Sequence, residues 1–230
     1  MNSQETTSGR RIAGWAGLLA APLGLFNLVT FMSVAGGDMT ALIDPSFVFA
    51  LPASSQALFT ASMIADALGF YLLVAMLGSY LATRLPVEQS GRVAIALPCL
   101  LIFAILGIIG ALVQMAALPA LSALNAAGAV GAAPAWAAIA VAAQGGLWWF
   151  EMLPFALFAL LLGPALRAAK VGFGRVLTVA GVLALIYWVL SIQGVAALPG
   201  AAMVAELCAF GALIAILTWA LLTGWALLRK

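Results

Sequence analysis

Six long apolar runs limit what this chain can fold into. Each contains about twenty or more predominantly apolar residues, the length that an α-helix needs to cross a bilayer. The connectors between the runs are too short to form a further domain. We therefore expect an all-α fold in which residues 1–230 make a single domain, a polytopic membrane bundle of six transmembrane helices. The expected spans are residues 12–34, 57–82, 93–118, 136–163, 176–198 and 203–228.

The composition excludes a soluble domain and several kinds of catalyst. Hydrophobic residues make up 66% of the chain and charged residues 7%, whereas soluble domains contain about 45–50% apolar and about 25% charged residues. The chain has no histidine, which excludes His-ligated haem, zinc and copper sites and Ser-His or Cys-His catalytic pairs. We predict that the protein is not an enzyme, holds no cofactor or metal, and has the lipid bilayer rather than nucleic acid as its partner.

The basic residues predict the orientation of the bundle. All nine precede the first span, follow the last one, or lie between spans two and three or four and five. Because Lys and Arg beside spans are retained in the cytoplasm, we expect both termini inside the cell. The connectors on the opposite side carry only Asp38 and Asp44 as charged residues. The basic residues are Arg10, Arg11, Arg84, Arg92, Arg167, Lys170, Arg175, Arg229 and Lys230.

A short motif raises the question of an internal repeat. Gly9-Arg10, Gly91-Arg92 and Gly174-Arg175 each open an odd-numbered span. One interpretation is a chain of three helical hairpins in the same orientation. The other is that arginine marks each cytoplasmic helix start without any duplication. Both interpretations stay open, because so short a motif is weak evidence for a repeat.

Three acidic residues lie inside predicted spans, one in each even-numbered helix: Asp66, Glu151 and Glu206. A charge at the bilayer centre costs at least about 2.5–3.5 kcal/mol, so such residues usually face the bundle interior or water. Asp66 and Glu151 fall in the middle to outer half of their helices, and Glu206 falls near the outer interface. No Lys or Arg lies inside a span to neutralise them. We interpret the acids as candidates for binding a ligand or protons, with a buried structural acid pair as the alternative.

Amide side chains fall at a similar depth to the acids. Asn27, Gln114 and Gln193 lie well past the arginine that begins each odd-numbered span. This arrangement predicts a polar cavity that faces outward and is closed on the cytoplasmic side by apolar residues. The alternative is that each amide only joins two helices by a hydrogen bond.

The fourth span presents a stripe of functional side chains. Gln144, Trp148 and Glu151 are spaced at i, i+4 and i+7, so a regular helix places them on one face. Pro154 and the pair Gly145-Gly146 predict an interrupted helix beside this stripe. Trp148 next to an acid is suited to a cationic or a flat apolar ligand, although aromatic packing alone also explains it.

A family resemblance rests on the start of the chain and on the placement of two acids. The segment Gly9-Arg10-Arg11-Ile12-Ala13-Gly14-Trp15-Ala16-Gly17-Leu18, the acid in span two and the acid at the head of span six are similar to the bacterial domain-of-unknown-function 4386 family. The resemblance implies a multipass protein of the bacterial cytoplasmic (inner) membrane with no assigned activity. The segment Trp148-Trp149-Phe150-Glu151 lies outside it.

Two functions from different classes follow from these observations. The first is binding or transport of a small molecule or protons through the outward-facing cavity, with Asp66 and Glu151 as the proton or cation site. Gln144 and Trp148 would contact the ligand, and Asn27, Gln193 and Glu206 are further candidates. The second is a non-catalytic subunit or scaffold of a larger membrane complex, whose small-residue helix faces bind partner helices.

Overall fold

The fold is all-α, as the sequence predicts. The computed structural model describes residues 3–229, and the side chains of residues 7–38 and 40–229. The chain is 86% helical and contains no strand within these described residues.

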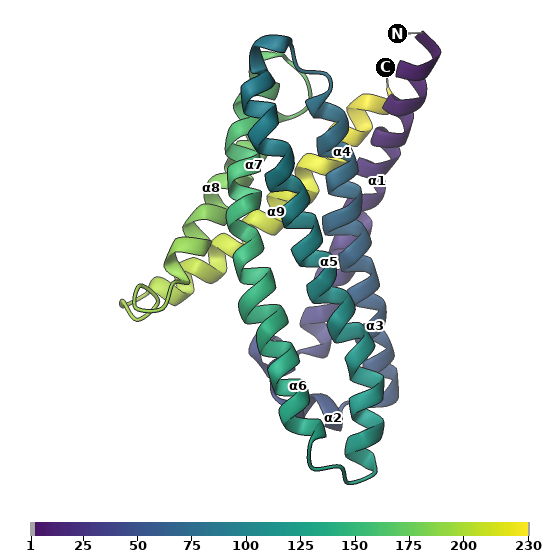
Figure 1. The fold of residues 1–230 in the computed structure, drawn as a ribbon, viewed down its shortest axis with the longest axis vertical. Coiled ribbons are helices and arrows are strands. Elements are labelled where there is room, and N and C mark those ends of the chain that lie inside the picture. Colours follow the sequence, from purple (N-terminus) through teal and green to yellow (C-terminus); the bar gives the residue numbers. More distant parts are fainter. Residues whose placement is uncertain (1–2, 230) are drawn as a thin grey trace.

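The helices follow one another with short connections. The long elements are α1 (Ser3–Val34), α3 (Ala53–Asp66), η2 (Ala67–Leu72), α4 (Leu73–Ala82), α5 (Ser90–Ala126), α6 (Ala132–Ala140), η4 (Val141–Leu147), α7 (Trp148–Ala168), α8 (Gly174–Leu190) and α9 (Ala201–Leu228). The π-helical segments η2 and η4 join their flanking α-helices without a break. Shorter pieces are η1 (Met39–Ile43), α2 (Pro45–Ala50) and η3 (Val87–Gln89). Helices α1, α3 to α5, α6 and α7 run roughly along the longest axis of the molecule, and α8 and α9 run obliquely to it (Figure 1).

Five helical stretches of the described chain are long and apolar enough to cross a membrane. They correspond to five of the predicted spans, and each extends beyond the predicted bounds at one or both ends. The structure is therefore compatible with an integral membrane protein. The five stretches are Thr7–Val34, Ala53–Ala82, Val87–Ala126, Ala132–Ala168 and Ala201–Leu228.

The predicted span 176–198 corresponds to a shorter helix. Helix α8 has 17 residues and ends at Leu190, so it is about 25 Å long at 1.5 Å per residue. Turns occupy the following residues up to Gly200, with left-handed backbone at Gly194 (φ 95°) and Gly200 (φ 78°). The apolar residues after Gly194 extend the hydrophobic run but do not continue the helix. The number of complete spans therefore stays a prediction.

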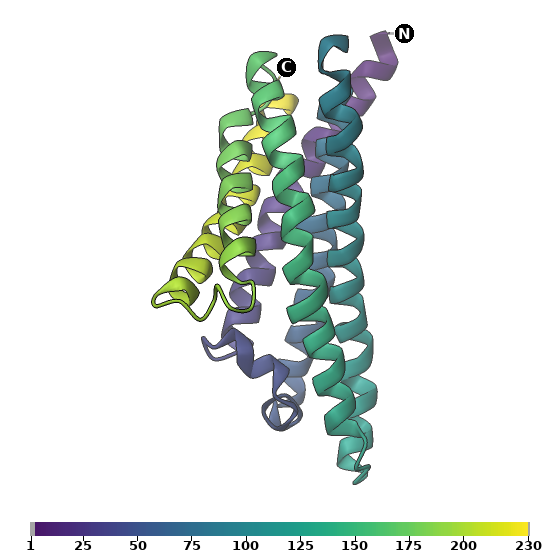
Figure 2. The same ribbon diagram turned by 60° about the vertical axis from the view of Figure 1, so that its left-hand side comes forward.

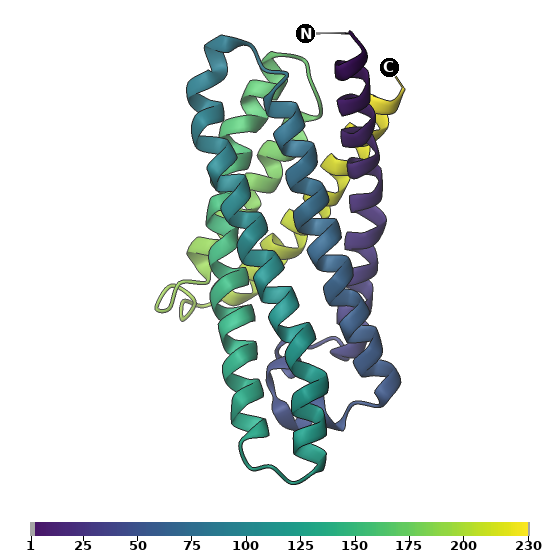
Figure 3. The same cartoon turned by 45° about the vertical axis from the view of Figure 1, so that its right-hand side comes forward.

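The connections that carry basic residues lie at one end of the bundle. Both termini, the α4–α5 connection and the α7–α8 connection lie at the end we call the basic end (Figures 1 and 3). The opposite end, called the loop end, holds α2 and the α5–α6 turn. The α8–α9 turn stops short of the loop end (Figure 2). This arrangement agrees with the predicted grouping of basic residues, and the side of the membrane that the basic end faces stays a prediction.

The long helices pack as a closed ring. Helix α1 packs on α9, α9 on α8, α8 on α7, α7 on α5, and α5 with α1 on the α3–η2 helix. Glycines allow the α1–α9 contact, since a Cβ at Gly17 would lie 2.5 Å from the Ala220 carbonyl oxygen and one at Gly224 would lie 2.6 Å from the Gly14 carbonyl oxygen.

Two separate apolar cores fill the ring. The larger core lies toward the basic end and includes Leu81, Leu100, Phe158, Leu166 and Trp219. The smaller core lies toward the loop end and includes Phe31, Leu42, Phe59, Leu118 and Trp136. The loop-end core reaches into the segment between α1 and α3, because Trp136 Nε1 donates a hydrogen bond to the Leu42 carbonyl at 3.1 Å. Asp66 lies in the sequence between Met63 of the loop-end core and Phe70 of the basic-end core, and Glu151 lies between Trp148, which packs against the loop-end core, and Met152 of the basic-end core.

Candidate functional site

A cavity of about 270 Å³ lies inside the helix ring. Its lining includes residues of α1, of the η1 segment, of both π-helical regions and of α7, α8 and α9. Five of the seven residues that the sequence singles out line this cavity: Asn27, Asp66, Gln144, Trp148 and Glu151. The structure thus brings together side chains that lie far apart in the sequence.

The sequence did not single out the two tyrosines of this cavity. Tyr71 comes from η2 and Tyr187 from α8. Both lie in strongly apolar runs, where an aromatic residue has the same pattern as a core residue. Thr40 and Ile43 of the connection between α1 and α2 also line the cavity, so this connection forms part of its wall on the side of the loop end. The other lining residues are Leu28, Phe31, Phe70, Met152, Ala209 and Leu213.

Each acid in the cavity accepts one hydrogen bond from a neutral side chain. Asn27 Nδ2 donates to Asp66 Oδ1 at 2.9 Å, and the Tyr71 hydroxyl donates to Glu151 Oε1 at 2.7 Å. Asp66 is 4% exposed and Glu151 is 1% exposed. These bonds connect α1 to the α3–η2 helix and η2 to α7, so the acids are part of the contacts that hold the ring together.

Two buried oxygen atoms of the cavity have no partner among the described residues. They are Glu151 Oε2 and Asn27 Oδ1. Most buried polar groups in proteins are hydrogen-bonded, and one left without a partner costs about 1–3 kcal/mol. Both atoms are hydrogen-bond acceptors. The site can therefore accept hydrogen bonds from a group that enters the cavity.

The described lining contains no Lys or Arg. Asp66 and Glu151 line the same cavity, and a second negative charge there would add to the cost of burying the first. Within the described residues no salt bridge compensates either acid, since their hydrogen-bond partners are an amide and a phenol. The arrangement can hold a proton, or a cation that replaces it.

Helix α5 positions the aromatic and amide side chains of the stripe. Gln144 Nε2 donates to Gln114 Oε1 at 2.8 Å, and Gln114 Nε2 donates to the Gly110 carbonyl at 3.0 Å. Trp148 Nε1 donates to the Gly107 carbonyl at 3.3 Å. Gln114 does not line the cavity, and its side chain holds Gln144 in place by a hydrogen bond. For Gln114 this agrees with the interpretation that an amide only joins two helices.

Both π-helical segments adjoin the cavity. Segment η2 begins directly after Asp66 and contains Tyr71, and η4 contains Gln144 and ends directly before Trp148. Such wide turns are rare and occur frequently at functional sites. The predicted interruption of the fourth span therefore lies in η4, at Gly145-Gly146, and not at Pro154, where α7 continues.

Two of the singled-out residues lie away from the cavity. Gln193 is exposed in the turn after α8, and Glu206 is exposed on α9. Neither lines the cavity. The depth estimate for Gln193 assumed that the helix continues to residue 198, but α8 ends at Leu190. Glu206 lies on the outer surface of the ring, although its helix contributes Ala209 and Leu213 to the lining.

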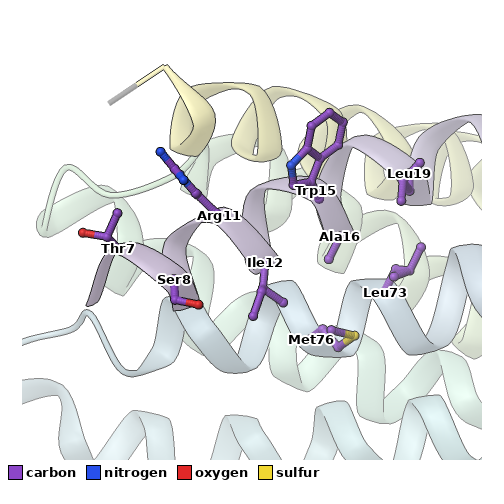
Figure 4. A pocket seen from close by; sticks show the side chains of 9 residues that line it. All are labelled: Thr7, Ser8, Arg11, Ile12, Trp15, Ala16, Leu19, Leu73 and Met76. Carbon is purple, nitrogen blue, oxygen red and sulfur yellow. The ribbon is translucent and has the colours of Figure 1, made fainter. Parts of the chain in front are cut away.

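A second hollow is a surface groove of about 700 Å³ near the basic end (Figure 4). It is formed by the N-terminal part of α1 and by Leu73 and Met76 of α4. Arg11 is its one charged side chain among the described residues, and most of the others are apolar. Arginine and tryptophan above apolar residues are typical of a lipid-facing surface at headgroup level, so we do not assign a small-molecule site there.

Other signals for chemistry are weak. Within the described residues, no group of three or more Cys, Asp or Glu side chains could hold a metal ion. Cys99 and Cys208 are free thiols.

Comparison with known proteins found no matching family model, no matching curated protein and no matching solved structure. The resemblance to the domain-of-unknown-function 4386 family therefore stays a prediction.

Proposed function

We propose that the protein is an integral membrane protein that binds a small molecule, together with protons, in the cavity between its two apolar cores. The observation that carries this proposal is the buried acid pair, of which Glu151 presents an unpartnered oxygen while lining a cavity of about 270 Å³. Ionisable residues inside a membrane are costly and usually mark a pathway or a binding site. A carrier or a receptor fits this arrangement.

The position of the cavity supports access from the loop end. Thr40 and Ile43 belong to a connecting segment, which is easier to displace than a packed helix. On the other side, the basic-end core separates the cavity from the termini with residues such as Leu81 and Leu166. A receptor would use only the loop-end route. A carrier would also have to open the basic-end core.

The membrane placement is part of the proposal. We place the protein in the bacterial cytoplasmic membrane with six spans and both termini inside, which makes the cavity outward-facing. The support is the grouping of the basic residues at the end of the bundle that holds the termini (Figure 1). Helix α8 would complete the sixth span at the short limit of about 17 residues.

The scaffold hypothesis lacks a supporting observation. It needs small-residue helix faces that are free to bind partner helices. Gly69, Gly107 and Gly110 are instead covered within the chain, since a Cβ at these positions would meet Leu23, Tyr71 and Trp148, respectively. A role as a complex subunit stays a prediction, and co-purification with other membrane proteins in mild detergent tests it.

The test of the proposed function compares acids inside and outside the cavity. The purified protein in detergent is screened for ligand-dependent rises in its thermal unfolding temperature, with a library of small cationic, anionic and neutral molecules. We expect Asp66→Asn and Glu151→Gln to remain folded and to lose the rise given by any ligand found. Glu206→Gln is the matched control, because Glu206 is exposed and outside the cavity, and it should respond like the wild type.

Two results would contradict the proposal. One is a ligand response that both cavity variants retain in full, which would place the ligand elsewhere. The other is a wild-type protein that no member of the library stabilises at concentrations up to about the millimolar range, where binding free energy is only about −4 kcal/mol.

A further inference from the structure

We propose that the ligand of the cavity is a small organic cation with at least one N–H donor, in the class of primary ammonium compounds with an apolar or aromatic body, and that it binds in exchange for a proton. This inference rests on the proposed function and names the ligand class of the same site. Three observations on the cavity lining carry it: its charge, its unused hydrogen-bonding atoms and its aromatic walls.

The charge of the lining favours a cation. Asp66 and Glu151 are its acidic residues, and it contains no Lys or Arg among the described side chains. An anionic ligand would face two carboxyl groups with no positive charge to oppose them. A cation supplies the missing partner, and a buried charge becomes tolerable only when it is paired and hydrogen-bonded.

The hydrogen-bonding atoms favour a donor. The buried atoms of the lining without a partner are Glu151 Oε2 and Asn27 Oδ1, and both accept hydrogen bonds. Five side-chain donors of the lining already bond within the chain: Asn27 to Asp66, Thr40 to Asp38, Tyr71 to Glu151, Gln144 to Gln114 and Trp148 to Gly107. A primary ammonium carries three donors and no acceptor, as a lysine side chain does. Its bonds to carboxylate are charge-assisted and stronger than neutral ones.

The walls and the volume define the rest of the ligand. Phe31, Phe70, Trp148 and Tyr187 line the cavity beside the acids. Aromatic faces attract organic cations and also accept an apolar body. At about 30 Å³ per water molecule, the volume of about 270 Å³ corresponds to roughly nine waters. A single-ring amine fits this space.

The exchange conserves charge in the cavity. Without ligand, a proton on the acid pair limits the buried negative charge, because desolvation disfavours a second carboxylate. When the ammonium enters, that proton leaves to water and the released carboxylate pairs with the cation. One positive charge replaces another, and no covalent bond to carbon, nitrogen or sulfur is formed or broken.

The experiment uses three probes of similar size that differ in charge: the cationic phenethylammonium, the neutral 2-phenylethanol and the anionic phenylacetate. Binding to the full-length protein in detergent is measured by calorimetry in two buffers with different ionisation enthalpies, which also gives the number of protons released. We expect phenethylammonium to bind at least about tenfold more tightly than 2-phenylethanol, with release of about one proton, and phenylacetate not to bind.

Three variants test which side chains are responsible for phenethylammonium binding and proton release. Glu151→Gln should weaken phenethylammonium binding by at least about tenfold and abolish proton release, because Asp66 is then the one acid of the lining and no second carboxylate has to be kept protonated before the cation enters. Glu206→Gln should leave both measurements unchanged. If Glu151→Gln unfolds the protein, Tyr71→Phe is the second variant: it keeps both acids and should retain proton release.

The outcomes separate the ligand class from the proposed function. Binding of 2-phenylethanol or phenylacetate as tight as that of phenethylammonium, lost in Glu151→Gln, overturns the cation class while the cavity stays a binding site. Phenethylammonium binding without proton release overturns the exchange. If no probe binds while the library screen yields a neutral or anionic ligand at the cavity, the class is wrong. If the cavity variants respond to every ligand as the wild type does, the proposed function itself fails.

Discussion

Tyr71 occupies its place because the neighbouring helix has no side chain there. Its ring lies against Gly107 of α5, where a Cβ would overlap the ring carbons, and its hydroxyl donates to Glu151 at 2.7 Å. The same tyrosine packs against Phe103 with ring centroids 5.0 Å apart. Packing against α5 therefore fixes the donor that the buried acid uses.

Replacing Gly107 with alanine should displace Tyr71 and so disturb the hydrogen bond that Tyr71 donates to Glu151. We expect Gly107→Ala to lower the free energy of unfolding by about 1–3 kcal/mol, because the added methyl group must displace the Tyr71 ring. Denaturation by SDS titration in mixed micelles measures the change. Gly91→Ala is the control in the same helix, since a Cβ there meets nothing within 4 Å. Equal stability of the two variants would show that the Tyr71 ring moves without cost.

Removing the tyrosine hydroxyl tests the hydrogen bond itself. Tyr71→Phe leaves both Glu151 oxygen atoms without a partner, because Oε2 has none in the wild type. We expect a loss of about 1–3 kcal/mol in the free energy of unfolding, measured by the same SDS titration. Tyr80→Phe is the control, since Tyr80 lies at the basic end away from the cavity. A loss no larger than that of the control would contradict a structural role for the bond.

At this scale the sequence predicts the acids but not their partners. Asp66 and Glu151 are conspicuous because charges are rare in apolar runs. Tyr71 and Tyr187 are not, since an aromatic residue in such a run is most often core. The pairing of Asn27 with Asp66 depends on which helices are neighbours, and periodicity within one helix does not contain that information.

At the scale of elements, two aspartates define the segment that covers the loop end of the cavity. Asp38 Oδ1 accepts from the Thr40 amide at 2.9 Å, and Asp44 Oδ1 accepts from the Ser46 amide at 2.8 Å. The side-chain hydroxyls of Thr40 and Ser46 donate to the same oxygens. These hydrogen bonds, the hydroxyl bonds first, lower the pKa of Asp38 and of Asp44 below the usual 3.8.

The lowered pKa values predict how this segment responds to acid. A carboxyl whose pKa is depressed in the folded state contributes stability above its usual pKa of 3.8, and this stability is lost as the pH falls through the lowered value. We expect hydrogen exchange in residues 38–50, relative to the intrinsic rate at each pH, to stay constant from about pH 7 to 5 and to rise below about pH 4. In Asp44→Asn the part of the response due to Asp44 should disappear. A rise that begins near neutral pH would contradict the capping explanation.

The π-helical segments differ from the regular α-helix that the residue spacing assumes. Gln144, Trp148 and Glu151 do line one cavity, as a regular helix predicts, yet η4 lies between α6 and α7 and widens the helix there. Exposed glycines at positions 145 and 146 permit this, and a Cβ at either would meet nothing within 4 Å. A π-helical turn depends on tertiary contacts with α5, so the sequence of one helix predicts an interruption but not its kind or position.

At the scale of the whole molecule, the apolar runs are sufficient to predict the fold class and five of the helical stretches. The closed ring was not predictable, because it depends on which small-residue faces meet. Helix α8 shows why the sixth run differs: Val195 and Leu198 continue the apolar pattern, but α8 has already ended at Leu190 and Gly194 adopts a left-handed conformation. Hydropathy indicates whether a segment prefers an apolar environment, but it does not determine the conformation of its backbone.

The membrane topology can be tested with single cysteines. In a background with Cys99→Ser and Cys208→Ser, Asp44→Cys and Glu88→Cys place exposed thiols at opposite ends of the bundle. We expect an impermeant maleimide added to intact cells to label the first and not the second, because the basic connections stay inside. Labelling of both after cell lysis is the control. Labelling of Glu88→Cys alone in intact cells would reverse the predicted orientation.

The length of α8 has a consequence for the membrane around the protein. A helix of about 25 Å is shorter than a hydrocarbon layer of about 30 Å, and if α8 spans the membrane as proposed, local thinning of the bilayer is one way to relieve this hydrophobic mismatch. Tyr187 lies one turn before the end of α8 and lines the cavity. Thinning beside α8 would therefore bring lipid headgroups and water near the depth of the binding site.

Membrane thickness should then affect this protein directly. We expect a higher thermal unfolding temperature in nanodiscs of short-chain phosphatidylcholine than in nanodiscs of long-chain phosphatidylcholine, because less deformation is needed around α8. Equal unfolding temperatures across the chain-length series would contradict this expectation. If thinning occurs as expected, the lipid composition of the membrane sets how readily water, and with it a ligand, reaches the acids at the centre of the bundle.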